Sequence, residues 1–368
     1  MFYVARNPVT NRHARLIRPV RKQVNRHVAL TKISSTLCTL GAQRARKDAG
    51  GEGMPLLRIN ATDRGLGLHG SAQPVLPSLH RAAADAPDAP DTRPIIVMVH
   101  GFRFAPDAGN DCPHTHILAS HERPRNRKAL SWPCALGLVG ADAPGLGIAF
   151  GWNALGSLWQ AHAQARSAGL HLAQVLSTLH RAAPRRPIHA IGHSMGARVI
   201  LQALPHCPPG ALHRLLLLHP AEYRSAAAQA LATPAGAQTQ VFWINSAENR
   251  LFDFALERLI PPPQPQDRIK DPDLPNLLPV HLSDPHTLEA LHARGLPVAP
   301  PQRRLCHWAG YLRPGVFDLY RAVLLHPQRH PFAALQAALA RPAPAAPSRF
   351  LAPVRMRAGL PLAGKAPS

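Results

Sequence analysis

The residues with the clearest chemical pattern form the pentapeptide Gly192–Gly196, which reads Gly-His-Ser-Met-Gly. A serine with glycines two positions before and after it can occupy a sharp turn, because bulky side chains there would collide with neighbouring backbone. A mostly apolar run precedes the pentapeptide at 188–191, and 197–204 carries apolar residues at helical spacing. Strand, Gly-x-Ser-x-Gly and helix in this order are typical of a nucleophile elbow. We therefore predict that Ser194 is the nucleophile of a covalent acyl-transfer reaction.

A second pattern lies earlier in the chain, where the apolar run Ile95–Val99 ends in His100-Gly101-Phe102. The two patterns, in this order, resemble those of the α/β-hydrolase superfamily. Within it, the chain is similar to a group of uncharacterised bacterial members over roughly residues 54–326. The resemblance implies that the backbone N–H groups of Phe102 and Met195 form the oxyanion hole. His100 and Gly101 are then expected to lie in the pocket.

The resemblance also implies the chain order serine, acid, histidine. We predict His307 as the general base, because it follows the segment 303–306, which we expect to be the last strand. The acid should follow the strand 241–245, where Glu248 and Asp253 are both candidates and Glu248 is favoured.

The sequence departs from the related group at one position, and it offers other histidines beside His307. The related group leads us to expect an aspartate near position 250, where this chain has Arg250. His193 is adjacent to the nucleophile, but successive residues of an elbow point in different directions, so we expect it to support the pocket wall. The five histidines that fit the role of the base less well lie on or near the helices around the predicted last strand: His281, His286, His292, His326 and His330.

A run of potential metal ligands, Cys112-Pro-His114-Thr-His116, lies in the irregular segment 103–146. Zinc sites need four ligands, and the sequence places no further Cys/His pair nearby. We therefore predict no metal and no cofactor. We expect His114 and His116 to line or brace the mouth of the active site.

Strands and helices alternate through most of residues 54–326, which predicts a mostly parallel sheet with helices on both faces. We expect an α/β-hydrolase fold without a large cap domain, because few residues separate the strand 215–218 from 241–245. The site walls should come from 103–146 and 261–280. The remaining expected elements are a hairpin (56–60 with 66–69), a strand at 147–152, and helices at 76–84, 154–182 with Asn153 as N-cap, 285–293 and 314–325.

The domain organisation follows from changes in composition. Residues 1–53 hold many Lys and Arg side chains and end in a glycine-rich stretch, so we predict a disordered basic extension. We expect residues 54–330 to form the α/β-hydrolase domain that the resemblance implies. Residues 331–368 are predicted to be a short helix followed by a disordered tail rich in Ala, Pro and Arg.

Charge and cysteine content limit the classes of partner and location. The formal net charge is +22, but much of the excess is concentrated at the N-terminus and no aromatic-studded basic stripe follows it, so we predict no specific nucleic-acid partner. The five cysteines are scattered and odd in number, which favours a reducing, cytoplasmic location. No apolar run reaches about 18 residues, so no membrane span is expected.

The expected function is that of a serine hydrolase, which cleaves a small-molecule ester or related acyl substrate through an acyl-enzyme. Acyl transfer to another acceptor would use the same triad and stays open. A non-catalytic binding protein with an α/β-hydrolase-like fold is the second alternative, and Arg250 is its main support. The sequence does not predict an oligomeric state.

Overall fold

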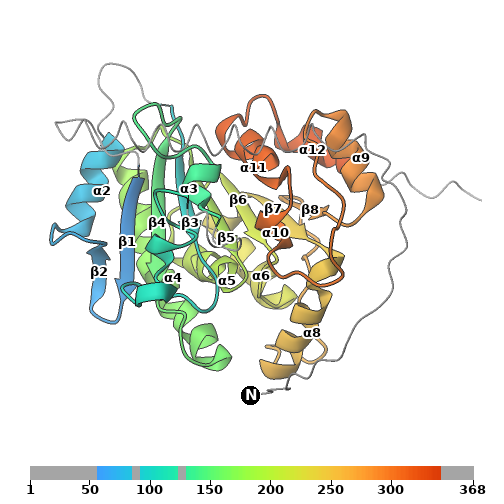
Figure 1. Ribbon diagram of the computed structural model, residues 1–368, viewed down its shortest axis with the longest axis horizontal. Coiled ribbons are helices and arrows are strands. Elements are labelled where there is room, and N and C mark those ends of the chain that lie inside the picture. Colours follow the sequence, from blue (N-terminus) through green and yellow to red (C-terminus); the bar gives the residue numbers. More distant parts are fainter. Residues whose placement is uncertain (1–55, 85–91, 123–129, 341–368) are drawn as a thin grey trace, which may run out of the picture.

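The computed structural model describes residues 56–84, 92–122 and 130–340, arranged around one eight-stranded sheet (Figure 1). The predicted N-terminal extension and C-terminal tail lie outside the described residues. The strand order is β2-β1-β4-β3-β5-β6-β7-β8, and every neighbouring pair is parallel except β1 with β2. The strands are β1 (Leu56–Thr62), β2 (Gly65–Leu68), β3 (Ile95–Val99), β4 (Leu146–Trp152), β5 (Ile188–His193), β6 (Arg214–Leu218), β7 (Gln240–Asn245) and β8 (Leu277–His281).

Helices cover both faces of the sheet, as the alternating pattern predicts. The first core cluster lies between the sheet and α2 (Val75–Ala84), α4 (Leu158–Ala182), α5 (Met195–Ala203) and α6 (Arg224–Leu231). The second lies between the sheet and α3 (Trp132–Ala135), α9 (Pro285–Ala293), α10 (Ala309–Leu312), α11 (Val316–Leu325) and α12 (Phe332–Leu339). Two further helices are α7 (Pro234–Ala237) and α8 (Arg250–Leu259). None of the helices in the described ranges is long and apolar enough to cross a membrane.

The central strand β3 shows why the sheet is buried on both sides. All five of its residues are fully buried. Alternate side chains of a strand point to opposite faces, and the residues divide accordingly. Ile95, Val97 and Val99 join the first core cluster, whereas Ile96 and Met98 join the second. A continuous apolar run of this kind is typical of a parallel strand with helices on both faces.

The connections reverse direction between β3 and β5. From β3 the chain leads to β4 on one side, and from β5 it leads to β6 on the other. In open α/β sheets, ligands bind outside the carboxyl ends of the strands at such a switch point. The residues that follow β3 and β5 are therefore the ones expected to meet at a site.

The start of the long helix differs from the prediction. Helix α4 begins at Leu158, with Ser157 as its N-cap and a reciprocal capping box between Ser157 and Gln160. Gly156, at φ +90°, turns the chain into the helix. Asn153 instead accepts a hydrogen bond from the Leu155 N–H in the preceding loop. A capping box satisfies two orphan N–H groups, which explains why Ser157 is the better start.

The last strand also differs. Strand β8 pairs in parallel with β7 inside the segment that we expected to be a wall loop, 261–280. Its Pro279 is tolerated because β8 is an edge strand. Residues 303–306 form no strand; the Cys306 N–H donates to the backbone oxygen of Glu248. The loop that leads to His307 is thus attached to the segment after β7 and does not join the sheet.

Candidate active site

Ser194 lies in a strained turn between β5 and α5. Its backbone has φ 55° and ψ −120°, a conformation that costs a non-glycine residue about 1–3 kcal/mol. The Ser194 N–H donates to the Leu218 oxygen at 2.9 Å, and the Ser194 oxygen accepts from the Ala221 N–H at 3.2 Å. These bonds on both sides hold the turn. The glycine at 196 is required by space, because a Cβ there would lie 2.4 Å from the backbone oxygen of His100.

The loop after β3 packs against this turn, as the resemblance implied. A Cβ built on Gly101 would lie 2.9 Å from the backbone oxygen of His193 and 3.3 Å from Ser194 Cβ. The N–H groups of Phe102 and Met195 donate to no group in the described part of the chain. Two unpaired backbone donors therefore border the serine, on the two segments where an oxyanion hole would need them.

His100 holds this loop from within. Its ring accepts a hydrogen bond from the Trp152 N–H at 3.0 Å, and its Nδ1 bonds the Gly101 oxygen at 2.8 Å. The Trp152 indole N–H donates in turn to the His100 oxygen at 2.9 Å. Complete burial lowers the pKa of His100 to about 4, so the ring is neutral. His100 therefore supports Gly101. Both of its ring nitrogens are occupied by hydrogen bonds to the backbone, so neither is available to transfer a proton.

His307 contacts an amide where the sequence led us to expect a carboxylate. Its Nδ1 lies 2.7 Å from Asn249 Oδ1, and its ring stacks on Phe252 with ring centres 4.7 Å apart. Burial, with a smaller effect of His219, lowers the pKa of His307 to about 3. The ring is therefore neutral, and because Asn249 Oδ1 can only accept, the proton lies on Nδ1. Nε2 is left with a lone pair, which is the form that a general base needs.

Asp253 lies behind the amide, one helical turn along α8. Asn249 Nδ2 donates to Asp253 Oδ1 at 2.7 Å. Burial raises the pKa of Asp253 to about 7, although the bond from Asn249 opposes the rise. The predicted acid candidate Asp253 is thus connected to His307 through Asn249, and it does not touch the imidazole. Asn249 was missed from the sequence because only carboxylates were considered for this loop.

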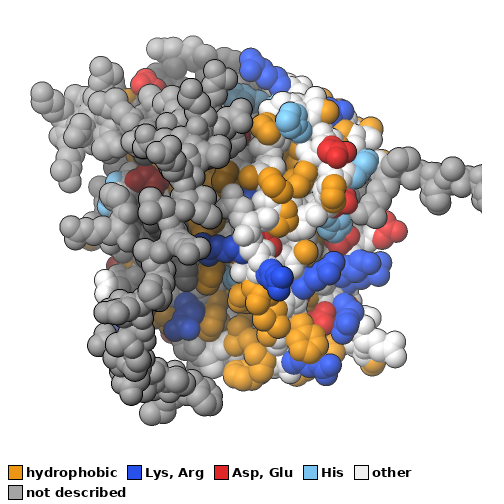
Figure 2. Space-filling model, turned by 45° about the vertical axis from the view of Figure 1, so that its right-hand side comes forward, with side chains coloured by type: hydrophobic (Ala, Val, Ile, Leu, Met, Phe, Trp, Pro, Cys, Tyr) orange, Lys and Arg blue, Asp and Glu red, His pale blue; other side chains and the backbone are white. Residues whose placement is uncertain are grey.

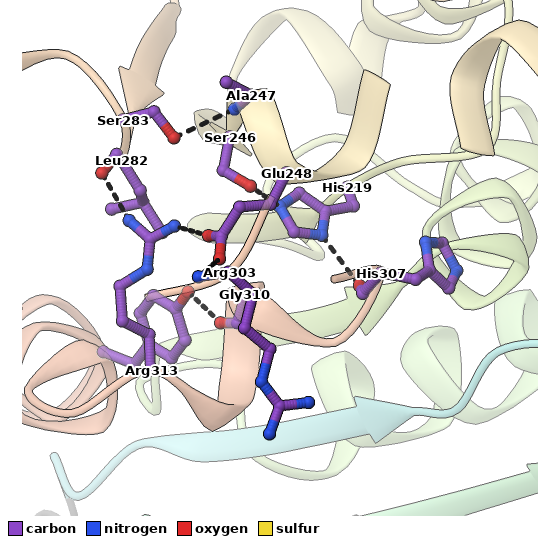
Figure 3. A network of polar contacts seen from close by, with 11 residues as sticks. His219, Ser246, Ala247, Glu248, Leu282, Ser283, Arg303, His307, Gly310 and Arg313 are labelled. Carbon is purple, nitrogen blue, oxygen red and sulfur yellow. Dashed lines mark hydrogen bonds and ion pairs between the residues drawn. The ribbon is translucent and has the colours of Figure 1, made fainter. Parts of the chain in front are cut away.

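Glu248, the favoured candidate, is occupied elsewhere (Figure 3). Its carboxylate forms a buried ion pair with Arg313, which also donates to the Leu282 oxygen. Glu248 Oε1 accepts from the Arg303 N–H at 3.2 Å. With the bond from Cys306, these contacts anchor the loop that carries His307. The structure does not bring Glu248 to the His307 ring; it makes Glu248 an anchor of the loop.

Two further histidines bind the backbone of His307. His193 Nε2 and His219 Nδ1 both donate to the His307 oxygen, each at 2.9 Å. His219 has φ 43°, and its Nε2 bonds the Ser246 hydroxyl at 3.0 Å (Figure 3). Burial lowers the pKa of both rings, that of His219 to about 4. Together, His193 and His219 hold the backbone of His307 in place. His219 was missed, although it follows the end of β6 at the same sheet edge as Ser194.

The hydroxyl of Ser194 makes no hydrogen bond to another described residue. The neighbouring residue, His193, packs against His307, with ring centres 4.6 Å apart. Catalytic hydrogen bonds are often long in ligand-free sites and tighten when substrate binds. A bond from Ser194 to His307 Nε2 would have to form in that way.

The two candidate histidines of the segment 103–146, His114 and His116, contact different parts of the molecule. His114 Nε2 bonds Asn60 Oδ1 at 2.8 Å, on β1. The His116 ring packs on Phe104, with centres 5.1 Å apart, and Phe104 packs edge-on against His100 at 5.5 Å. His116 therefore packs, through Phe104, against the loop that carries His100 and Gly101, whereas His114 belongs to the contact between this segment and the β1–β2 hairpin.

An apolar surface adjoins the site at helix α8, the helix that carries Phe252. Figure 2 shows hydrophobic side chains gathered on this face of the molecule, with Lys and Arg side chains among them. The Trp159 indole N–H donates to the Leu259 oxygen at 2.7 Å, which joins the start of α4 to the end of α8. The large apolar residues exposed here are Trp159, Leu251, Phe252, Phe254, Leu259 and Leu305.

Comparison with known families adds little about chemistry. A family model described as "Protein of unknown function (DUF726)" matches residues 126–208. The matched segment contains β4, α4, β5, Ser194 and α5. The chain is therefore similar to that family across the elbow itself. No curated protein matches the chain.

Proposed function

We propose that the protein is a serine hydrolase of the α/β-hydrolase fold, in which Ser194, His307 and Asn249 form the catalytic unit. The observation that carries this proposal is the strained conformation of Ser194, at φ 55° and ψ −120°, between a central parallel strand and a helix. Strain of this kind persists where the surrounding structure imposes it, and it is a feature of the nucleophile elbow. The position at the switch point of the sheet supports the same function.

In the proposed reaction, the Ser194 Oγ attacks the carbonyl carbon of an ester while His307 Nε2 takes the hydroxyl proton. The negative charge on the tetrahedral oxygen is stabilised by the N–H groups of Phe102 and Met195. The protonated His307 then gives its proton to the leaving alcohol, and an acyl-enzyme remains. Water, deprotonated by the same Nε2, attacks the acyl carbon and restores Ser194.

An amide can replace the usual carboxylate because of its orientation. The third member of a triad must keep the histidine proton on Nδ1 and fix the ring, and cysteine proteases of the Cys-His-Asn type use an amide for this purpose. Here Asn249 Oδ1 faces His307, and Asn249 Nδ2 faces Asp253. An amide turned by 180° would present N–H groups to His307 and favour the unreactive tautomer. We assign Asp253 the role of a positioning residue that holds Asn249 in the productive orientation.

The proposed substrate is an ester with an apolar acyl or alcohol group. Phe252 stacks on the His307 ring and is itself partly exposed, so an apolar surface begins at the base. This surface continues along α8 to the indole of Trp159. Burial of apolar area gives about 25 cal/mol per Å², which favours longer chains over short ones. Preference should therefore rise with acyl length in a series of p-nitrophenyl esters.

The test is labelling of the purified protein with a fluorophosphonate probe, followed by peptide mapping. The wild type is expected to be labelled at Ser194 alone. Ser194→Ala should lose both the label and ester hydrolysis, while the control Ser71→Ala, a change at an exposed turn, should keep both. A folded wild type that neither reacts with the probe nor hydrolyses any ester of the series would refute the enzyme and leave a non-catalytic binding protein as the better description.

A further inference from the structure

Three potential metal ligands meet away from the proposed catalytic unit. They are His69, which directly follows β2, and Asp107 and Cys112 from the segment after β3. A ring nitrogen of His69, a carboxylate oxygen of Asp107 and the Cys112 sulfur all lie within 4.8 Å of one another. The fold thus brings together a nitrogen, an oxygen and a sulfur donor from distant parts of the chain.

The spacing of the first two atoms fits a shared ion. His69 Nδ1 lies 3.2 Å from Asp107 Oδ1. Two ligands of a tetrahedral zinc ion with bonds of about 2.0 Å are separated by roughly 3.3 Å. His69 Nδ1 is buried and has no hydrogen-bond partner among the described residues.

A second group of contacts orients these ligands. Asp107 Oδ2 accepts from Asn60 Nδ2 at 3.3 Å, which leaves Oδ1 directed to His69. Asn60 Oδ1 bonds His114 Nε2 at 2.8 Å, and the His114 ring packs on the His69 ring with centres 4.4 Å apart. Asp107 has φ 61°, an uncommon backbone conformation for a residue other than glycine. Such supporting hydrogen bonds and packing are what fix the ligands of metal sites.

We propose that His69, Asp107 and Cys112 bind a zinc ion, with water as the fourth ligand. A set of one imidazole nitrogen, one carboxylate oxygen and one thiolate sulfur suits zinc better than the harder magnesium or calcium ions. On binding, the Cys112 thiol becomes a thiolate and its proton passes to solvent, so each ion bound releases one proton.

The other histidine cluster is a poorer candidate. The ligand atoms of His193, His219 and His307 also lie within 4.8 Å of one another. However, His193 and His219 use their facing N–H groups to bond the His307 oxygen, so these nitrogens have no lone pair for an ion. The cluster at His69 lacks such a bond, which is why it carries the proposal.

The site would connect two parts of the molecule. It links the β1–β2 hairpin to the segment that begins with Gly101 and Phe102. In that segment the Arg103 N–H donates to the Ala154 oxygen, and the Ala105 N–H donates to the Asp111 oxygen. An ion there would add a rigid attachment on the outer side of the proposed oxyanion loop. The inference does not depend on the hydrolase proposal.

The experiment uses the full-length purified protein and two probes, Zn²⁺ and Co²⁺. We expect metal analysis to find zinc at one ion per chain. After the metal is removed by a chelator, added Co²⁺ should produce a thiolate-to-cobalt charge-transfer band, which competes away with Zn²⁺. Cys112→Ser should abolish this band. The control Cys207→Ser, at a thiol that donates to the Ala203 oxygen at the end of α5, should keep it.

Two further variants guard against misfolding at the buried Cys112. His69→Gln and Asp107→Asn change more exposed side chains, and each should weaken Zn²⁺ binding at least 10-fold while circular dichroism stays that of the wild type. A folded wild type that gives no charge-transfer band with Co²⁺ would overturn the proposal. So would a band that persists in folded Cys112→Ser.

Discussion

The bond between Asn249 and Asp253 offers the sharpest test of the proposed catalytic unit. We expect Asp253→Ala to lower kcat and to leave KM within about twofold, because Asp253 reaches His307 only through Asn249. Without its acceptor, the Asn249 amide can rotate and present N–H groups to His307. The imidazole proton then moves to Nε2, where it prevents general-base catalysis.

The magnitude follows from the bond that is lost. A hydrogen bond to a charged group contributes about 1.5–3 kcal/mol, and 1.36 kcal/mol corresponds to a factor of ten in rate. Asp253→Ala should therefore reduce kcat about 10- to 150-fold at pH 8, where the carboxyl, with its pKa of about 7, is mostly ionised. Asp253→Asn retains an oxygen that can accept a hydrogen bond from Asn249, so kcat should fall by less than about tenfold in this variant.

The assay is steady-state hydrolysis of the best p-nitrophenyl ester between pH 5 and 9. Wild-type kcat should fall as pH drops through about 7, because protonated Asp253 is a weaker acceptor, and this limb should vanish in Asp253→Asn. Glu257→Gln, one turn further along α8, should keep the wild-type kcat at high pH, while the limb moves to lower pH because the Glu257 charge helps to raise the pKa of Asp253. The reasoning fails if folded Asp253→Ala keeps wild-type kcat, or if Asp253→Asn loses as much as Asp253→Ala.

Three other changes have clear expected outcomes. Glu248→Gln leaves the buried Arg313 without its charge partner, so urea unfolding should show a loss of about 3–5 kcal/mol. Gly196→Ala, whose Cβ would meet backbone oxygens at 2.4 Å, should cost about 1–3 kcal/mol in the same assay, whereas Gly67→Ala has open space and should be nearly neutral. Asp253→Asn should become more stable than the wild type as pH rises from about 4 through 7. The pKa of Asp253 is raised in the folded state, so ionisation of its carboxyl disfavours folding of the wild type. If the free energy of unfolding in urea depends on pH equally in the two proteins, this reasoning is contradicted.

The central sheet could be predicted from the sequence because its strands carry a strong local signal. The run at β3 is apolar at every position. The glycines on both sides of Ser194 are best explained by a tight turn at that residue. Strand β8 was missed because Pro279 and the surrounding prolines are typical of a loop. An edge strand that needs only one partner tolerates such a residue, and the pairing with β7 that decides the matter is not local.

The proposed catalytic unit could be predicted only in part. Ser194 and His307 are proposed from chain order, whereas the contact of His307 with Asn249 depends on where a loop without regular structure comes to lie. That loop is positioned by the buried pair of Glu248 and Arg313, residues 65 positions apart. The sequence offers no periodic pattern for such a pair. Glu248 was therefore taken for the acid, although its charge is used to anchor the loop.

Helix α8 has a consequence for the thermal behaviour of the protein. Only Leu256 among its ten residues is buried, although the helix supplies both Phe252 and Asp253 to the surroundings of His307. Elements with few buried contacts open locally at much lower free energy than the whole domain. The proposed activity would then be lost whenever this weakly attached helix unfolds locally. If the proposed function holds, heating should abolish ester hydrolysis while the sheet is still intact. Ligands that cover the apolar face of α8 should preserve hydrolysis at higher temperatures without an equal rise in the melting temperature of the whole domain.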